Sequence, residues 1–222
     1  MENKVLYPCD YVNNARDNMP KPLTREYFET LLNDINVQLL CEKVRFLCEE
    51  VRENKPYVET YKPQLPAICW QAKFEGKLRT AANAQPTGFF CLDVDCHHED
   101  MFRVLLKEKG VEEAYAWAEN EAINRSSEWA RMAREEEGNM FNRREREPLN
   151  IVAVHVSPSG MGVHVVACCD PSCKSIEENQ ARLARLLNTS YDAVCKDWPR
   201  IFFVTPRRDW TYIDYETLFE SE

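Results

Sequence analysis

Several stretches of the chain place apolar residues three or four positions apart, which is the spacing of one helical face. In the first of them, Phe28 and Leu31 follow Thr24 at this spacing. We therefore predict a helix that Thr24 caps at its N-terminus. Similar patterns predict further helices over residues 37–53, 101–109 and 175–187.

Other stretches are apolar at almost every position, as is typical of strands that are buried on both faces. The clearest covers residues 88–95 and ends in Asp93 and Asp95. The short, glycine-containing turn between residues 150–157 and 163–169 predicts a β-hairpin. Because helices and strands interleave along the chain, we predict an α+β or α/β fold with a mixed sheet. The remaining strands are expected over residues 67–74, 200–205 and 210–213.

Two segments differ from this core. Residues 1–22 hold three prolines among polar residues, so we expect a loosely ordered lead-in to a single domain over residues 23–222. Residues 111–148 are rich in Ala, Glu and Arg, with a few apolar residues at helical spacing before a charged stretch. We expect this segment to form a helical insertion between core elements, with its charges on a solvated face.

Composition restricts the class of protein. The 222 residues are 44% hydrophobic, which is enough for a substantial core. No apolar run approaches the roughly 18 residues that span a bilayer, and the first residues lack the apolar block of a secretory signal. We therefore expect a soluble, cytoplasmic protein with no membrane partner and ten reduced cysteines. The net charge of −9 disfavours tight non-specific binding to nucleic acid, but it leaves room for a local basic groove.

Asp93 and Asp95 are the strongest candidates for chemistry. Residues i and i+2 of a strand point to the same face, so the two carboxylates should project side by side. Such a pair is costly unless a cation lies between its members. Mg²⁺ suits this position because it binds one or two protein carboxylates together with substrate phosphates. The alternative is a structural pair at the end of a strand that caps the next helix, in which Asp100 or Glu99 also takes part.

The turn that precedes the strand at 163–169 suits an anionic ligand. It contains Ser159, Gly160 and Gly162, and successive backbone N–H groups of such a turn can cradle a phosphate. His164 follows directly. It is a candidate for a phosphate contact, with an ordinary buried position in the strand as the alternative.

Two further candidates follow the helix predicted at 175–187. Asp192 is the natural third carboxylate, and Arg200 lies eight positions later at the start of a strand. A guanidinium is well shaped for a triphosphate or a template phosphate. A salt bridge between Arg200 and Asp197 is the structural alternative.

In their order and spacing, these segments resemble the three motifs of the archaeo-eukaryotic primase superfamily. Within this superfamily, the chain resembles the VirE N-terminal-like family of bacterial mobile-element proteins. The motifs are an apolar run ending in Asp-x-Asp, a small-x-His motif, and an apolar run ending in an acid. They correspond here to residues 91–95, 162–164 and 190–192. Family-like flanks are residues 62–67 followed by Arg79, the turn 157–162, and residues 197–200 before the apolar run 201–204.

The resemblance implies a primase-polymerase catalytic core, in which an RRM-like module packs on an αβ module with the active site between them. It implies that Asp93, Asp95 and Asp192 ligate two catalytic Mg²⁺ or Mn²⁺ ions, and that His164 contacts the triphosphate of an incoming NTP or dNTP. The implied partners are a single-stranded DNA template and a helicase or primase C-terminal domain. The nucleotide pocket would also be lined by Ser159, Gly160, Gly162, Arg200 and Arg79.

The chain departs from the family pattern in three places. Met161 stands where relatives often carry lysine, which removes a positive charge from the turn. Tyr191 and Ser190 precede Asp192 in place of a strongly apolar pair. The segment 111–148 is longer than the link expected there.

A zinc site is the rival interpretation of the Cys and His residues. The chain has no Cys-x-x-Cys pair, and adjacent ligands would point to opposite sides of a strand. We therefore do not expect zinc, and we expect the cysteines to pack as small hydrophobes. The residues concerned are Cys96, His97, His98, Cys168, Cys169 and Cys173.

Three functions are compatible with these residues. The first is metal-dependent nucleotidyl transfer that makes or extends a primer on single-stranded DNA during mobile-element replication. The second is a non-catalytic module that holds nucleotide or DNA for a partner helicase, which the acidic net charge favours. The third is a metal-dependent nuclease that uses the same acids without a triphosphate.

Overall fold

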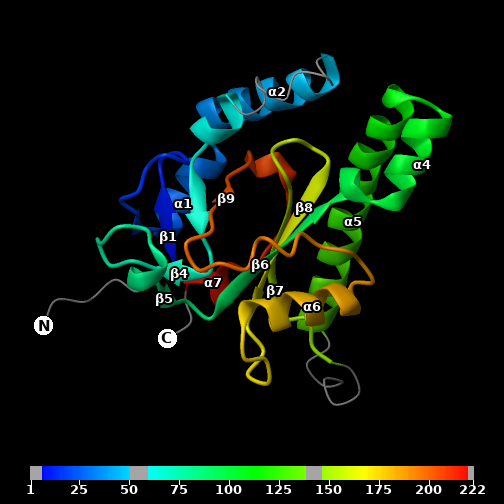
Figure 1. Ribbon diagram of the computed structural model, residues 1–222. Helices are drawn as coiled ribbons and strands as arrows, with labels where there is room; N and C mark the ends of the chain where they lie inside the picture. The colour runs from blue at the N-terminus through cyan, green and yellow to red at the C-terminus, as the bar shows by residue number, and fades with distance from the viewer. Residues whose placement is uncertain (1–6, 51–59, 139–146, 220–222) are drawn as a thin grey trace, which may run out of the picture.

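The computed structural model describes residues 7–50, 60–138 and 147–219 (Figure 1). Its strands are β1 (Asp10–Val12), β2 (Lys21–Pro22), β3 (Ala67–Cys69), β4 (Ala72–Lys73), β5 (Gln85–Pro86), β6 (Phe89–Asp95), β7 (Ile151–Val156), β8 (Gly162–Cys168), β9 (Phe202–Phe203) and β10 (Trp210–Ile213). Its α-helices are α1 (Arg25–Leu32), α2 (Ile35–Glu50), α4 (Asp100–Glu108), α5 (Val111–Gly138), α6 (Ile176–Leu186) and α7 (Tyr215–Phe219). Short 3-10 turns are η1 (Lys62–Gln64), η2 (Ala81–Asn83), η3 (Cys96–His98) and η5 (Arg207–Asp209).

Two four-stranded sheets organise the described residues. Their strand orders are β2-β1-β3-β9 and β10-β7-β8-β6, and neighbouring strands are antiparallel wherever their pairing is described. The α+β class is confirmed, whereas the expected mixed sheet is wrong. The connection from β6 to β7 passes over β8, and the connection from β8 to β10 passes over β7. Strands that run in the same direction are therefore never neighbours in this sheet.

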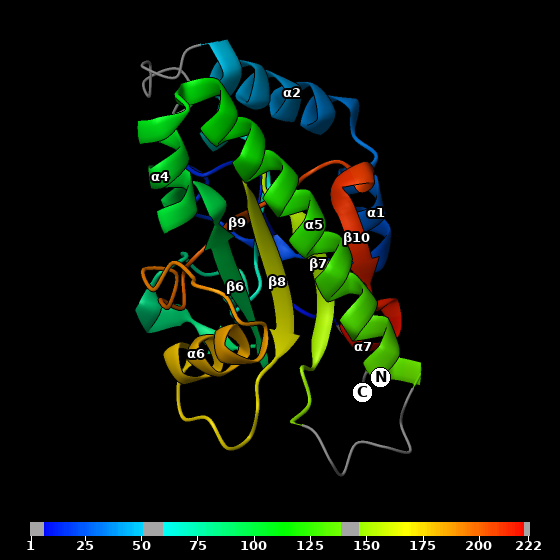
Figure 2. The same ribbon diagram turned by 90° about the vertical axis from the view of Figure 1, so that its right-hand side faces the viewer.

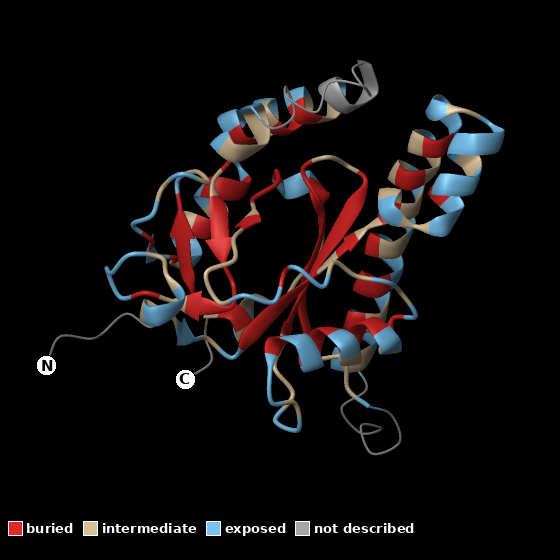
Figure 3. Cartoon of the chain, in the orientation of Figure 1, coloured by how far each residue is buried: buried red, intermediate tan, exposed pale blue. Residues whose placement is uncertain are grey.

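The β10-β7-β8-β6 sheet forms the central layer of the molecule (Figure 1). Helices α5 and α6 cover one of its faces (Figure 2), where Val94 and Val163 pack with Ala118 of α5. The opposite face packs with α1 and the β2-β1-β3-β9 sheet, through contacts in one core that includes Cys91 and Phe28. The central strands are buried along most of their length (Figure 3), as their continuous apolar pattern predicts.

Helix α5 is a core element and not an insertion, so that expectation is wrong. Its 28 residues lie along the sheet and contact β7, β8 and β10 (Figure 2). Small side chains let the helix approach the strands closely, while Ile123 is exposed. Alanine has high helix propensity on any face, so composition alone does not distinguish a buried alanine face from a solvated one. The buried face consists of Ala114, Ala118, Ala122, Ser126, Trp129, Ala130 and Ala133.

The N-terminal segment is also part of the fold, from residue 7 onward. Strand β1 is buried and pairs with β2 on one side and β3 on the other. Asp10 accepts a hydrogen bond of 2.6 Å from the backbone N–H of Phe74. Pro22 lies in the outer strand β2, where a missing N–H is tolerated. The expected loosely ordered lead-in is therefore wrong over residues 7–22, and residues 1–6 lie outside the described chain.

Most other elements follow the sequence pattern. Thr24 caps α1 by accepting from the N–H of Tyr27, and β7 and β8 form the expected hairpin. The strand expected over 67–74 is divided into β3 and β4, and the strand expected over 200–205 is reduced to β9. No helix among the described residues is both long enough and apolar enough to cross a membrane. Part of the helix expected over 37–53 and most of the charged stretch after α5 lie outside the described residues.

Candidate metal and nucleotide site

The strand register brings the first two motifs together. Asp93 of β6 lies opposite His164 of β8, and Asp95 lies opposite Gly162. Alternation along β6 places both carboxylates on the face that carries Cys91, which is the face packed toward the β2-β1-β3-β9 sheet. The site therefore lies at the end of the central sheet, on the side of the second sheet.

Asp93 and His164 form the centre of the site. Oδ1 of Asp93 is 3.4 Å from Nε2 of His164, and His164 is buried. Burial by itself raises the pKa of Asp93, but the charges of His164 and Lys62, with hydrogen bonds from His164 and the Cys195 thiol, lower it to about 2. Asp93 is therefore ionised at neutral pH in a poorly solvated position.

Asp192 joins Asp93 from a loop after α6. The backbone N–H of Asp192 donates to the carbonyl of Asp93 at 2.8 Å. The Sγ of Cys195 lies 3.5 Å from Oδ2 of each aspartate, and ligand atoms of the three residues lie within 4.8 Å of one another. Burial and the charge of Asp93 raise the pKa of the Cys195 thiol, so it remains protonated and donates to the carboxylates. The arrangement offers two carboxylates to a hard divalent cation.

Asp95 faces a different set of ligands. Its carboxylate oxygens lie 3.9 Å from Nδ1 of His97 and 3.6 Å from Nδ1 of His98. Burial and the charge of Asp93 raise the pKa of Asp95, while Lys62 opposes the shift. The side chain of Asp95 makes no capping bond to the 3-10 turn that follows, so the capping alternative is not what the structure shows.

The turn 157–162 is closed on itself. The N–H of Gly160 donates to the carbonyl of Ser157 at 2.9 Å, and the N–H of Met161 points to Oγ of Ser159 at 3.4 Å. Gly160 has a positive φ of 81°, which suits glycine. A Cβ on Gly162 would lie 2.8 Å from the carbonyl oxygen of Val94, so that position needs glycine for close strand contact. The N–H groups of Gly160 and Met161, expected to cradle an anion, are thus directed inside the turn.

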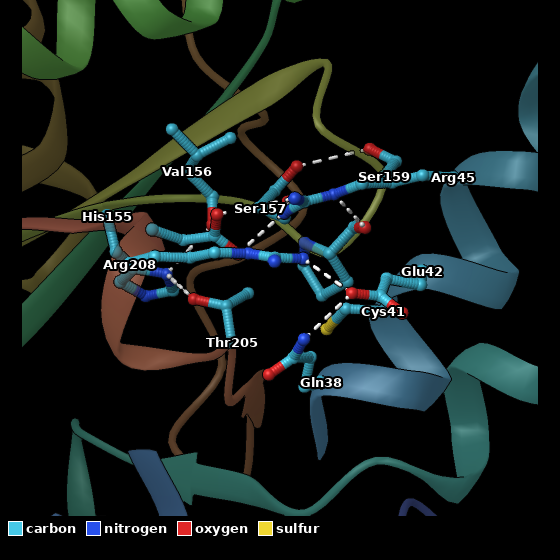
Figure 4. Close-up of polar contacts among 12 residues, drawn as sticks. Gln38, Cys41, Glu42, Arg45, His155, Val156, Ser157, Ser159, Thr205 and Arg208 are labelled. Carbon is cyan, nitrogen blue, oxygen red and sulfur yellow. Dashed lines mark hydrogen bonds and ion pairs between the residues drawn. The ribbon is translucent and has the colours of Figure 1, made fainter. Parts of the chain in front are cut away.

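Arg45 of α2 holds this turn in place (Figure 4). From the sequence it was only a charged residue on a predicted helix. Its Nε donates to the carbonyl of Pro158 at 3.3 Å. Its Nη2 donates to Oδ2 of Asp209 at 2.6 Å and reaches the carbonyl of Ser157 at 3.5 Å. One guanidinium therefore ties the turn to helix α2 and to the segment before β10.

Arg79 and Arg200 fix the loop that carries Asp192. Arg79 donates to the carbonyl of Pro199 at 2.8 Å. Arg200 donates to Oδ1 of Asp197 and to the carbonyl of Val194, so the salt bridge left open as an alternative is present. Both guanidinium groups are engaged with the protein itself.

Two residues near the site were not singled out from the sequence as site residues. His155 of β7 lies opposite His164 in the β-ladder, and it stacks on Trp210 with ring centroids 4.0 Å apart. Burial, followed by the charge of His164, lowers the pKa of His155 well below its ordinary value. Lys62 appeared only in a flanking segment, yet its charge lowers the pKa of both Asp93 and Asp95. In the sequence, His155 was recognisable only as a polar residue inside an otherwise apolar strand.

The Cys and His residues of the zinc rival do not gather into one cluster. Among the described residues, the groups of three possible metal ligands are Asp93 with Asp192 and Cys195, and Asp95 with His97 and His98. Neither group contains Cys96, Cys168, Cys169 or Cys173.

Comparisons of this chain with protein-family models, with curated proteins and with solved structures find no match. The function is therefore inferred from the geometry of the site.

Proposed function

We propose that this chain is a metal-dependent nucleotidyltransferase of the primase-polymerase type that uses nucleoside triphosphates on a single-stranded DNA template. The observation that carries the proposal is the convergence of three distant segments. Asp93 lies opposite His164 across the β6–β8 ladder, and Asp192 binds the backbone of Asp93. These are the residues that the three motifs of the resemblance assign to metal and triphosphate.

The donor set fits Mg²⁺ or Mn²⁺. Asp93 is ionised, and the oxygens of Asp93 and Asp192 lie close enough to share one ion. Mg²⁺ commonly takes one or two carboxylates and leaves the rest of its shell to water and phosphate oxygens. When bound, such an ion would neutralise phosphate charge and polarise the reacting phosphoryl group. Asp95, two residues further along β6 and on the same face, is the third candidate ligand.

The protein's own residues then have binding and orienting roles. Lys62 is the cation whose charge reaches both Asp93 and Asp95, so it is suited to hold a phosphate beside them. His164 is placed by its strand partner at the carboxylate pair and has a buried Nδ1 without a described hydrogen-bond partner. Nucleotidyl transfer needs no side-chain nucleophile, because a 3′-hydroxyl attacks the α-phosphate, the bond between the α- and β-phosphates breaks and pyrophosphate leaves. Positioning and charge compensation are therefore what this site has to supply.

The topology of the central sheet supports the proposal in part. Its elements follow the order β6, α4 and α5, β7, β8, α6, β10, which contains two split β-α-β units. As in an RRM-like module, the first strand pairs with the third and the third with the second. The last strand pairs with the second instead of the first, which departs from that arrangement.

A non-catalytic nucleotide- or DNA-binding module that works with a partner helicase is the second candidate. It is favoured by the engagement of Arg79 and Arg200 with the protein itself and by the net charge of −9. Met161, where the family often has lysine, is buried and offers no charge to a phosphate.

The test is a titration of ATP and dATP into the protein with and without Mn²⁺, using wild type, Asp93→Ala and His164→Ala. Asp100→Ala is the matched control, because its carboxylate is exposed and pairs only with Arg103 among the described contacts. We expect metal-dependent binding in wild type and in the control, and at least about tenfold weaker binding in the two site variants.

Primer extension on single-stranded DNA then separates the two candidates. Extension by wild type and its loss in Asp93→Ala would support the enzyme. Metal-dependent nucleotide binding without extension would support the binding module. Nucleotide binding that is absent from wild type, or equal in all variants, would contradict the proposed site.

A further inference from the structure

The cluster of Asp95, His97 and His98 lies at the end of β6, beside the proposed catalytic carboxylates. We propose that it binds one first-row divalent transition-metal ion, distinct from the ion held by Asp93 and Asp192, with Asp95 as the carboxylate that borders both sites. Its ligands are one carboxylate and two imidazoles, whose candidate ligand atoms all lie within 4.8 Å of one another. It shares His97 and His98 with the zinc rival considered from the sequence, but Asp95 takes the place of the cysteines.

The local fold explains how two adjacent histidines reach the same carboxylate. In a strand, His97 and His98 would point to opposite faces. The chain leaves the strand at Asp95 and curls into the 3-10 turn η3, in which the N–H of Glu99 donates to the carbonyl of Cys96. This curl turns Nδ1 of both imidazoles back toward the two oxygens of Asp95.

The spacing of the three groups suits ligation better than direct hydrogen bonding. The Nδ1 atoms of His97 and His98 are 3.9 and 3.6 Å from the oxygens of Asp95, beyond ordinary hydrogen-bond distances. Two ligands that each lie about 2.1 Å from a metal are roughly 3.0–3.5 Å apart in tetrahedral or octahedral geometry. The two distances from Asp95 to the imidazoles would each close by only a few tenths of an ångström to reach ligand spacing.

The cluster is held by contacts outside it. The ring of His97 packs edge-on against Phe102, with centroids 6.3 Å apart. The turn is anchored at one end by the N–H of Cys96, which donates to the carbonyl of Met161 at 3.0 Å. At the other end, Glu99 forms a salt bridge with Arg125 of α5. Such support reduces the ordering cost of binding a metal.

The ligand chemistry separates this site from its neighbour. Imidazole nitrogens favour Zn²⁺, Co²⁺ or Ni²⁺, whereas a site of carboxylates suits Mg²⁺ or Mn²⁺. The Asp95–His97–His98 cluster should therefore take a transition metal in an excess of Mg²⁺. His98 is 67% exposed at its side chain, so solvent can reach the cluster and complete the coordination shell.

The test is a titration of Co²⁺ into the whole protein in excess Mg²⁺, followed by visible d–d absorption. Wild type should bind one equivalent, and His98→Ala should bind at least about tenfold more weakly. The control Asp100→Asn removes an exposed carboxylate five residues after Asp95 and should leave the affinity unchanged. Because His98 is exposed, His98→Ala should fold like wild type, which circular dichroism would check.

Three outcomes would overturn the proposal. They are no Co²⁺ binding by wild type, equal affinity in wild type and His98→Ala, or an intense thiolate-to-cobalt band that identifies cysteine ligands. The experiment contains no nucleotide, and the inference does not depend on the proposed nucleotidyl transfer. Its failure is therefore distinguishable from failure of the nucleotide titration.

Discussion

Asp93 and His164 face each other across the β6–β8 ladder, with Oδ1 of the carboxylate 3.4 Å from Nε2 of the imidazole. The two residues are 71 positions apart in the sequence, and the hairpin of β7 and β8 brings them together. Burial of Asp93 opposes its ionisation. The charge of His164, together with smaller contributions from Lys62 and Cys195, outweighs this effect and lowers the pKa of Asp93. The pair thus keeps the carboxylate of Asp93 ionised in a poorly hydrated place.

Replacing the histidine should change the titration of the aspartate. In His164→Gln, burial remains while the main stabilising charge is lost, so the pKa of Asp93 should rise from about 2 toward or above its ordinary value of about 3.9. Carboxyl-carbon NMR of the metal-free protein would measure the shift. Asp17, whose pKa is lowered by hydrogen bonds from its own loop, should titrate as in wild type. An unchanged pKa of Asp93 would contradict the assigned cause.

A methyl group at position 162 should separate two strands. In Gly162→Ala, the Cβ would lie 2.8 Å from the carbonyl oxygen of Val94 and 3.1 Å from Oδ1 of Asp95. The backbone cannot yield cheaply, so we expect a loss of about 1–3 kcal/mol in the free energy of unfolding. Urea unfolding would measure it.

Gly138→Ala is the matched control for this change. A Cβ at this helical position meets nothing within 4 Å. We expect stability to stay the same or to rise by up to about 1 kcal/mol, because alanine favours the helix. Equal losses in both variants would show that crowding at Gly162 is not the cause.

Removal of the Arg45 guanidinium should loosen the turn 157–162. Arg45→Ala leaves the mostly buried carboxylate of Asp209 without its ion-pair partner, and it removes the donor to Pro158. We expect a loss of about 2–4 kcal/mol in the free energy of unfolding. Nucleotide binding should also weaken if the turn orders the site.

Arg208→Ala is the control for charge removal. Arg208 pairs with Glu42 at 3.0 Å, but both side chains are more than 40% exposed. An exposed pair contributes little, so stability should change by less than about 1 kcal/mol. If Arg208→Ala costs as much as Arg45→Ala, the effect belongs to overall charge and not to the turn.

Buried His155 should make the protein less stable as pH falls. Its pKa in the folded state is lowered by burial and by His164, so the unfolded chain binds the proton more readily. The stabilisation is complete above the unfolded pKa of about 6.5 and declines below it, by at most about 1.4 kcal/mol per pH unit. Unfolding by urea between pH 7.5 and about pH 5 would measure this slope.

The variant His155→Gln tests the assignment of that slope to one residue. Gln keeps a polar group near Thr205 but does not titrate. We expect lower stability at pH 7.5, because the stacking on Trp210 is lost, and a shallower decline toward pH 5. A slope identical to that of wild type would assign the pH dependence to another group.

Local patterns were sufficient for most elements. The run 88–95, the hairpin of β7 and β8, and the helix after Thr24 all appear where the apolar spacing predicted them. Their signals are local because period and capping depend on neighbours along the chain. For the same reason, it was predictable that Asp93 and Asp95 lie on one face of the strand.

Where an element depends on distant partners, its place in the fold was not predicted. Strand β1 is only three residues long and is stabilised by pairing with β3, more than fifty residues away. Helix α5 is buried by contact with β7, β8 and β10, although its sequence is rich in charge and alanine. The spacing of apolar residues within such a segment does not show whether the segment contacts another part of the chain or solvent.

The sequence by itself determined most of the secondary-structure elements of the central sheet and placed two carboxylates on one face of a strand. Only the tertiary structure decided what those carboxylates meet: His164 and Asp192 beside Asp93, and the two adjacent histidines beside Asp95. The physical reason is that strand alternation is set by the backbone of one segment. Register between strands and the curl after β6 are set by packing across the whole fold.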